Sequence, residues 1–540
     1  MLFVVCLCRF SRNQQQAGPV PSVHTAAAPA KDPGPPGPLP RFLPDRAPGL
    51  HLPRSLTRRE TRSYVCPSAF FKLFFCSQMV AQICLYTNRY AALLGEEKPS
   101  LYKTWYDLTP DEFYRFIGLL MYMSIIQAPN LEVYWSTQSL YHGLWARAFM
   151  SKLRFKQIQS FLKISNPDTE RENDKLRKVR FVHDFLQRKC MKFWQPNEFV
   201  SVDERMVRNK GRYSFRQYIK DKPTKWGMKL WVVADSVTGY TYNFNVYTGK
   251  DGSRSVFGLG YDVVMTLCKS LLHQGYKVFM DNFYTSLQLF MDLFKKKTLA
   301  CGTILTNRKG FPGELRDTKA FNKTANRGNM RWIRKGYLGI IQWKDNKIVN
   351  MLTTMHKRLS AKGFCSRRTK VNDQFRQMHV SQPNVVADYN KYMGGVDRSD
   401  QMIGKYKVLR KTSKYWKTLF YHFIDIARVN SFIMFQEFRR KNADISELNR
   451  PKKYGQLDFT VELIKQLGEI GESDPVPLYE KIKADSHQLV PVFTNLQRNC
   501  VRCYRLLKVQ HRTQVKCGKC DKHFCFSRKR NCLVEEHMTE

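Results

Sequence analysis

Residues 199–205 of this chain are FVSVDER, and the element order that begins here identifies the architecture. The alternation of apolar residues predicts a half-buried strand that carries Asp203 on a rigid backbone. Two later stretches also deliver one aspartate each: Asp281 follows the apolar run at 278–280, and Asp397 follows the glycine pair at 394–395. Carboxylates on rigid neighbouring elements can hold two Mg²⁺ ions about 4 Å apart for phosphodiester cleavage and transfer.

The periodicity after residue 199 predicts alternating strands and helices. Strands are expected at 199–207, 226–235, 240–248, 276–280 and 299–305, and helices at 254–273 and 286–297. This β-β-β-α-β-α-β order is that of an RNase H-like fold, in which one carboxylate lies on the first strand and another just past the fourth. Asp203 and Asp281 occupy those two places, so we predict a mixed α/β fold with an RNase H-like catalytic domain.

The regions on either side differ in composition. Residues 11–58 are rich in Pro, Gly, Ala and Gln, which predicts disorder. The sequence TPDE at 109–112 is a helix start within a helical region at 64–198. Helices are expected at 68–82, 138–151, 154–163, 178–192, 388–403 and 413–438. Residues 306–385 are basic and partly β-like, and because they precede Asp397 we interpret them as an insertion in the catalytic fold.

The charge balance indicates the class of partner. The chain carries 90 Lys and Arg against 45 Asp and Glu, a formal net charge of +45, while a hydrophobic content of 43% fits a folded protein. A polyanion is the natural counterpart, because each neutralised phosphate releases a counterion. Binding to a membrane surface and packing in a ribosome are alternatives, and we favour nucleic acid. The longest apolar stretch, 116–126, is too short for a transmembrane helix.

Basic residues interleaved with aromatic residues flank the predicted carboxylates. Such interleaving suits a DNA channel, with cations for phosphates and rings for stacking on distorted bases. A solvated basic face is the alternative. The predicted DNA contacts are Arg205, Arg212, Lys222, Lys225, Lys229, Arg410, Lys411 and Trp416.

The acidic residues require a choice between neighbours. In a strand Asp203 faces away from Glu204, so only one of them is expected in the site, and we choose Asp203. Each aspartate alone could equally be a turn or a helix cap, but their joint placement in so basic a chain favours catalysis. Asp397 and Asp400 are three residues apart and would share a helical face. Asp397 is the expected third metal ligand, and Asp400 could be an acid that orients it.

A cysteine cluster ends the chain: six of the 15 cysteines lie after residue 499. This clustering favours a metal site in a reducing compartment over a disulfide framework. Paired C-x2-C motifs suit tetrahedral zinc, because a tight turn points both thiolates at one ion. The ligands outside the pairs indicate two zinc ions in an interleaved module, with His511 or His523 as an eighth ligand. The predicted zinc ligands are Cys500, Cys503, Cys517, Cys520, Cys525, Cys532 and His537.

Three of these stretches together resemble the piggyBac family of DNA transposases and their host-derived relatives. They are SVDE at 201–204, MDNFYTS at 280–286 and YNKYMGGVDRSDQM at 389–402, of which the last is long and highly specific. Supporting matches are KPTKWG at 222–227, NRKG at 307–310 and NSFI at 430–433. The resemblance covers about residues 65 to 540.

The resemblance implies a dimeric enzyme that nicks double-stranded DNA at transposon ends, forms and opens a hairpin on the transposon, and inserts it at TTAA sites. It implies two Mg²⁺ ions per active site, and one or two Zn²⁺ ions in a cysteine-rich domain. The implied catalytic residues are Asp203, Asp281 and Asp397, with a fourth acidic position at Asp400. Trp416 falls where the family carries a tryptophan near the active site. The Pro-rich N-terminus and the loose Cys525–Cys532 spacing depart from the family pattern.

The resemblance also implies a domain layout. A helical dimerization and DNA-binding domain, in two parts, would surround an RNase H-like catalytic domain that is interrupted by an insertion. The expected boundaries are a disordered N-terminus at 1–63, helical parts at 64–198 and 410–496, catalytic parts at 199–305 and 386–409, an insertion domain at 306–385 and a zinc-binding domain at 497–540.

We therefore expect a piggyBac-like transposase. A domesticated DNA- or chromatin-binding protein without transposition activity is the rival, although all three aspartates are present. A RING-like ubiquitin ligase would rest on the cysteine cluster alone. Basic clusters at 439–441 and 450–453 resemble a bipartite import signal and predict a nuclear protein.

Overall fold

The computed structural model of the protein describes most of the chain. The described residues are 32–58, 65–95, 97, 99–141, 143–220, 222–249, 255–371, 374–408, 412–470, 491–518, 520–527 and 530–537. The chain divides into two compact units, Met1–Gln127 with Leu153–Gly468, and Ala128–Lys152 with Glu469–Glu540.

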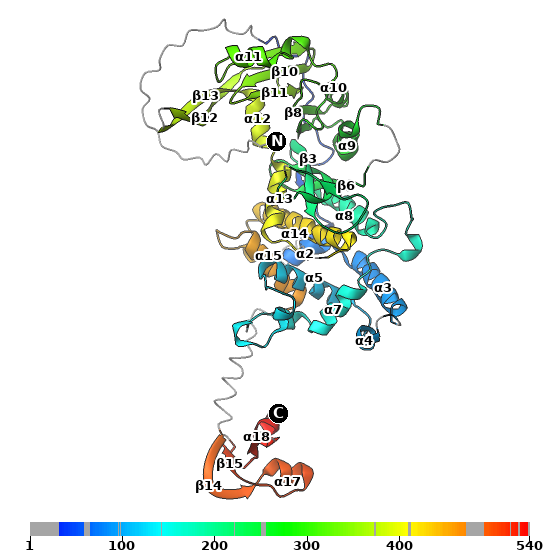
Figure 1. Ribbon diagram of the computed structural model, residues 1–540, viewed down its shortest axis with the longest axis vertical. Coiled ribbons are helices and arrows are strands. Elements are labelled where there is room, and N and C mark those ends of the chain that lie inside the picture. Colours follow the sequence, from blue (N-terminus) through cyan, green and yellow to red (C-terminus); the bar gives the residue numbers. More distant parts are fainter. Residues whose placement is uncertain are drawn as a thin grey trace. The chain divides into compact units, whose positions relative to one another are not determined.

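A mixed sheet of nine strands forms one part of the first unit, the upper part in Figure 1. Its first part consists of β3 (Phe199–Arg208), β5 (Trp226–Asp235), β6 (Thr241–Val246), β7 (Lys277–Met280) and β8 (Leu299–Thr303). β5 pairs antiparallel with β3 and β6, whereas β3, β7 and β8 run parallel. Helices α9 (Leu259–Leu267) and α10 (Leu287–Lys295) connect the last strands, so the predicted element order is observed. A short β4 (Gln217–Tyr218) pairs with β5 in addition.

The region expected as an insertion extends the same sheet. β11 (Ile348–Thr353) pairs with β8, and β10 (Leu338–Lys344) and β9 (Met330–Lys335) follow in antiparallel order. Phe279 of β7, Ile341 of β10 and Met351 of β11 share one hydrophobic core, so the added strands are anchored to the first part of the sheet. Also in this region are α11 (Thr318–Thr324), β12 (Ala361–Val371) and β13 (Gln374–Pro383).

Helices make up the rest of the first unit. They are α1 (Arg54–Thr57), α2 (Pro67–Phe74), α3 (Ser77–Leu93), α4 (Pro99–Tyr102), α5 (Pro110–Ile125), α7 (Lys152–Phe161), α8 (Arg180–Phe193), α12 (Asn384–Tyr392), α13 (Gly395–Lys405), α14 (Tyr415–Lys441) and α15 (Gln456–Gly468). α14 is buried along most of its length; its Phe435 packs edge-on against Phe70 of α2. The predicted cap is observed, because the Glu112 amide donates to Thr109 Oγ1 (3.3 Å).

Some predicted helices have other bounds. The helix expected at 68–82 is two helices that meet at Phe75 and Cys76, and the one expected at 388–403 breaks between α12 and α13. The helix expected at 138–151 is reduced to α6 (Ala146–Phe149) and a 3-10 turn. Among the described residues no single helix has the length and apolar character to cross a membrane, although α2 and α3 pass that test as a bent pair.

The predicted disorder of the N-terminal segment is wrong for residues 32–58, and its remaining part, 1–31 and 59–63, lies outside the described residues. Asp32 pairs with Arg334 on β9 (2.6 Å), and Gln274 donates to Asp45 (2.9 Å). β1 (Gly49–Leu50) pairs with β2 (Trp194–Gln195). Residues 32–50 lie along the first unit as an extended chain. A proline-rich extended backbone forms no internal hydrogen bonds, so distant side chains supply its partners.

The second unit contains the cysteine cluster. Its C-terminal elements are β14 (Pro491–Asn499), α17 (Val501–Leu507), β15 (Arg512–Cys517), β16 (Phe526–Ser527), β17 (Arg530–Asn531) and α18 (Cys532–His537). A small core of cysteines with Phe524 and Leu533 replaces a larger hydrophobic core, which is typical of modules that depend on a bound metal.

Candidate catalytic and metal-binding sites

The ends of β3 and β7 bring acidic side chains together. These strands are parallel and pair Val202 with Met280, so the next residues, Asp203 and Asp281, lie side by side. Carboxylate oxygens of Asp203, Glu204 and Asp281 all lie within 4.8 Å of one another. The structure thus gathers two of the predicted aspartates and adds a residue that sequence reasoning had excluded.

The exclusion of Glu204 is corrected by this geometry. Alternation does place Asp203 and Glu204 on opposite faces of β3. Asp281, however, lies just beyond the last residue of β7, where no strand separates the two faces. The longer glutamate side chain can therefore reach the same point. The DE pair next to a predicted strand end was the available signal, and simple alternation concealed it.

The three clustered carboxylates of Asp203, Glu204 and Asp281, here called the acidic group, repel one another more strongly than the neighbouring cations compensate. Burial, followed by the neighbouring Glu204, raises the pKa of Asp203 well above its usual range. The same causes raise the pKa of Asp281 to about 6. Lys222 opposes both shifts without cancelling them. An all-oxygen set of clustered, electron-rich carboxylates fits a hard divalent cation such as Mg²⁺, which would relieve this repulsion.

Helix α13 brings the third predicted carboxylate to the sheet. A Cβ on Gly395 would lie 2.5 Å from Ser201 Oγ, so only glycine permits this close approach to β3. The amide of Val396 donates to the same oxygen (3.2 Å). Asp397 follows in the first turn. Its pKa is raised by burial, by Asp400 and by Glu204, which places it in the same electrostatic field, outside the 4.8 Å group.

Buried Arg205 forms an ion pair with the partly exposed Asp400 instead of the predicted contacts. The Arg205 side chain is 2% exposed, and its Nε donates to Asp400 Oδ1. Nη2 donates to Ser399 Oγ (2.8 Å). The expected phosphate contact of Arg205 is corrected, because alternation on β3 turns this residue toward α13. Asp400 has Arg205 as its direct partner.

The other predicted DNA contacts separate into four groups. Lys222 Nζ lies 3.4 Å and Lys229 Nζ 4.0 Å from the Glu204 carboxylate, so both border the acidic group. Lys229 also lies 3.8 Å above the Trp231 ring. Arg212 and Lys225 are exposed, whereas Trp416 is buried in α14, contrary to a stacking role on DNA. Arg410 and Lys411 lie outside the described residues.

Four of the predicted zinc ligands form one group. Sulfur atoms of Cys500, Cys503, Cys525 and Cys532 all lie within 4.8 Å of one another. The Cys503 sulfur is 3.9 Å from that of Cys525 and 3.5 Å from that of Cys532. A tetrahedral ion with Zn–S bonds of about 2.3 Å requires sulfur atoms about 3.8 Å apart, so the donors fit zinc.

The remaining cysteines lie between the members of that group in sequence. Cys517 and Cys520 interact with each other and are not in the four-sulfur group. In the sequence, the Cys517–Cys520 pair therefore lies between members of the four-sulfur group. His523 is buried beside them, with Nδ1 3.2 Å from the Thr513 carbonyl oxygen. The side chain of His537 lies outside the described atoms.

Known proteins share this combination of fold and sequence. A model of the family described as Transposase IS4 matches residues 66–432, so the protein is of the transposase class. The chain belongs to the piggyBac transposase family. Human PiggyBac transposable element-derived protein 3 is 26% identical over 463 residues, which are 84% of this chain and 74% of that protein. Human PiggyBac transposable element-derived protein 2 is 28% identical over 382 residues, 68% of this chain and 61% of that protein.

A solved structure is similar over nearly the whole chain. It is the cryo-EM structure of a piggyBac transposase synaptic complex with hairpin DNA, with a TM-score of 0.66 and 24% sequence identity. The match covers 89% of this chain and 98% of that one. The mixed α/β fold is thus that of piggyBac transposase.

Proposed function

We propose that the protein is an RNase H-like, metal-dependent DNA transposase that binds transposon ends and joins them to TTAA targets. The observation that carries the proposal is the acidic group of Asp203, Glu204 and Asp281 beside the helix that holds Asp397. The net charge of +45 supports a nucleic acid substrate.

The residues of the site would divide the work between them. Asp203 and Asp281, on adjacent strands, would hold two Mg²⁺ ions, and Asp397 would complete the site from α13. Mg²⁺ held there would supply Lewis-acid chemistry, for the activation of water or a 3′-hydroxyl and for the charge on the leaving oxygen. Lys222 and Lys229 keep two positive charges at the rim of the acidic group, where the phosphate of the scissile bond must enter.

The cysteine module would bind zinc. Cys500, Cys503, Cys525 and Cys532 hold one ion, and Cys517 with Cys520 contributes to a second. By family resemblance the protein would act as a homodimer on double-stranded DNA, and its basic clusters favour the nucleus.

A domesticated DNA-binding protein is the second candidate. The human relatives are named transposable element-derived proteins, a name that does not describe a mobile element. The ion pairs of Glu204 with Lys222 and Lys229 would fit a site that holds DNA without cutting it.

Excision of a reporter flanked by the inverted repeats nearest the gene distinguishes the two. We expect wild-type protein to excise the reporter, and Asp281→Ala to lose excision while retaining binding to the repeats. Asp262→Ala, an exposed aspartate on α9, is the matched control and should excise normally. Cutting by Asp281→Ala would disprove the assigned site. No excision by any variant, with intact binding, would favour the domesticated protein.

A further inference from the structure

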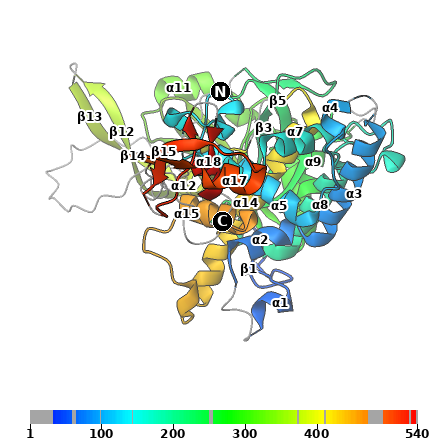
Figure 2. The same ribbon diagram turned by 90° about the horizontal axis from the view of Figure 1, so that it is seen from below.

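Strands β12 and β13 form a two-stranded ribbon. They pair antiparallel with each other, and among the described strands with no other. Figure 1 shows the ribbon extending away from β10 and β11, and in Figure 2 it projects to one side of the molecule. Such a ribbon exposes most of its surface, so its side chains indicate what it contacts.

The two faces of the ribbon differ in composition. Cys365 and Met378 pack against the core of the sheet, with Val380 buried between strands and core. Alternation places the neighbouring residues on the opposite, outer face. The exposed residues of this outer face are Phe364, Ser366, Arg368, Phe375, Gln377 and His379, and Ser381, opposite Phe364, is half-buried.

Two phenylalanines on this outer face are unusually exposed. Phe364 is 72% and Phe375 is 74% accessible. Phe375 pairs with Lys370, six positions after Phe364, so the rings lie about 20 Å apart along one face. Arg368 lies between them. Large apolar side chains on a projecting element indicate a binding partner that covers them.

The charge of the ribbon specifies the chemistry of that partner. Residues 361–383 contain five Lys and Arg residues and one Asp. Arg367 pairs with Asp345 (3.0 Å), and Lys362 with Asp388 (3.0 Å). Arg368 has no acidic partner among the described residues. The partner must therefore supply negative charge together with flat apolar surfaces, and nucleic acid has both.

We propose that the outer face of this ribbon binds double-stranded DNA, with Arg368 on a phosphate and Phe364 and Phe375 against bases at distorted steps. The inference rests on the proposed function and adds a second DNA contact to it, away from the carboxylates. The major groove of B-DNA admits a two-stranded ribbon, and apolar side chains wedge between base pairs in bent DNA. A spacing of about 20 Å corresponds to about six base pairs. Flexible TA steps, as in TTAA, cost least to distort.

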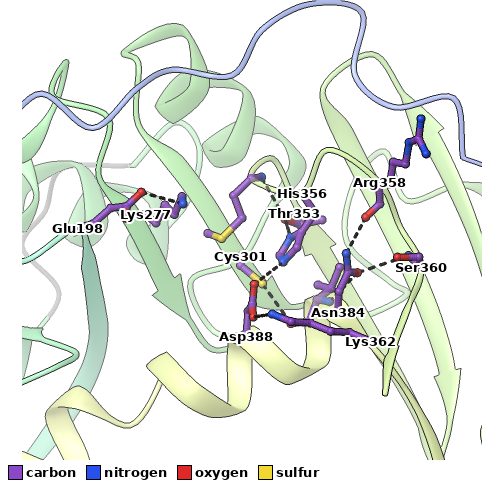
Figure 3. A network of polar contacts seen from close by, with 12 residues as sticks. Glu198, Lys277, Cys301, Thr353, His356, Arg358, Ser360, Lys362, Asn384 and Asp388 are labelled. Atoms are coloured by element: carbon purple, nitrogen blue, oxygen red, sulfur yellow. Dashed lines mark hydrogen bonds and ion pairs between the residues drawn. The ribbon is translucent and has the colours of Figure 1, made fainter. Parts of the chain in front are cut away.

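Residues at the base of the ribbon contact α12, the helix that precedes α13 and its Asp397 (Figure 3). Asp388 of α12 accepts from Lys362 (3.0 Å) and lies 3.2 Å from His356 Nε2. Asn384 donates to the Arg358 carbonyl (2.7 Å). Because α12 leads directly into α13, DNA held by the ribbon has a defined position relative to Asp397.

Binding of the full-length protein to a duplex with a central TTAA, at several salt concentrations, tests the inference. Arg368→Ala should lower the slope of log affinity against log salt by about 0.9, as for one lost phosphate contact. Phe364→Ala and Phe375→Ala should each weaken binding roughly 5- to 150-fold with the slope unchanged. Arg376→Ala, an exposed arginine on the other face of the same ribbon, is the control and should change neither quantity.

Each outcome has one meaning. If wild-type protein binds no duplex, the proposed function fails, and this inference with it. If wild type binds, and the Phe364, Phe375 and Arg368 variants bind equally well, this inference alone is wrong. Phe364→Ala could instead change the mass of the oligomer in solution and leave DNA affinity unchanged. The outer face would then be a contact between copies of the chain, and this inference would be wrong.

Discussion

The pair formed by Arg205 and Asp400 combines two unequal environments. The Arg205 side chain is 2% exposed, whereas that of Asp400 is 35% exposed. Removal of one member of an ion pair lowers the free energy of unfolding most when the remaining charge is buried, because water cannot replace the lost partner there. The pair joins β3 to α13, so it also fixes the distance between Asp203 and Asp397.

We therefore predict unequal effects of removing the two partners. Asp400→Ala leaves Arg205 buried and unpaired, and should lower the free energy of unfolding by about 3–5 kcal/mol. Arg205→Met leaves a hydrated aspartate and should cost about 1 kcal/mol. Urea denaturation measures both. The double variant Arg205→Met/Asp400→Leu should recover most of the loss. Equal losses in the two single variants would contradict the assigned asymmetry.

Glu204 gives a second prediction at this scale. Glu204→Gln removes one carboxylate from the acidic group and should weaken Mn²⁺ binding there roughly 10- to 100-fold. Calorimetry on zinc-loaded protein measures it. Glu198→Gln is the control, because this glutamate pairs with Lys277 (2.8 Å) and lies outside the group. Unchanged affinity in Glu204→Gln would show that Glu204 only neutralises the two lysines.

At the scale of elements, Asp388 connects α12 to the ribbon and to the turn after β11. Hydrogen bonding from His356, followed by Lys362, lowers the pKa of Asp388 to about 2. A depressed pKa means that the folded protein favours the ionised carboxylate. The stabilisation is therefore present above the usual pKa of 3.8 and is lost as the pH falls toward 2.

Asp388→Asn should thus destabilise the protein by about 1–2 kcal/mol near neutral pH. The difference from wild type should shrink between about pH 4 and pH 2, where the wild-type carboxylate takes up its proton. Thermal unfolding across this range measures it, with the exposed Asp262→Asn as control. A difference that persists at pH 2 would mean that packing, and not charge, holds α12 in place.

Elements whose signals are local could be predicted from the sequence. β5 was predicted with its observed bounds because its apolar run, LWVVA at 230–234, ends just before the turn sequence at 236–239. The start of α5 was predicted because Thr109 and Glu112 carry the whole cap within one turn. The break at Cys76 has no glycine or proline to mark it. The ion pair of Arg205 could not be predicted, because its partner Asp400 lies 195 positions away in the sequence. Only the docking of α13 on β3 brings the two side chains together. The same holds for the outer face of the ribbon, which depends on which side meets the core.

For the whole first unit, residues 32–50 connect parts that are distant in sequence. Asp32 accepts from Arg334 and from the Leu359 amide (2.7 Å) at one end of the segment. At the other end Arg46 donates to the carbonyl oxygens of Lys192 (2.6 Å) and Met191 (2.9 Å), which end α8. Between them, a Cβ on Gly275 would lie 1.9 Å from the Arg41 carbonyl oxygen, so the segment lies directly on the chain before β7.

A chain that begins at residue 51 should therefore be less stable than one that begins at residue 32. The shorter chain leaves Arg334, whose side chain is 4% exposed, without its carboxylate, and this alone should cost about 3–5 kcal/mol. Asp32→Ala in the longer chain should reproduce most of the loss, because it removes the same carboxylate and leaves the rest of the segment in place. Thermal unfolding compares the three proteins. If all three unfold at the same temperature, the segment contributes nothing to stability.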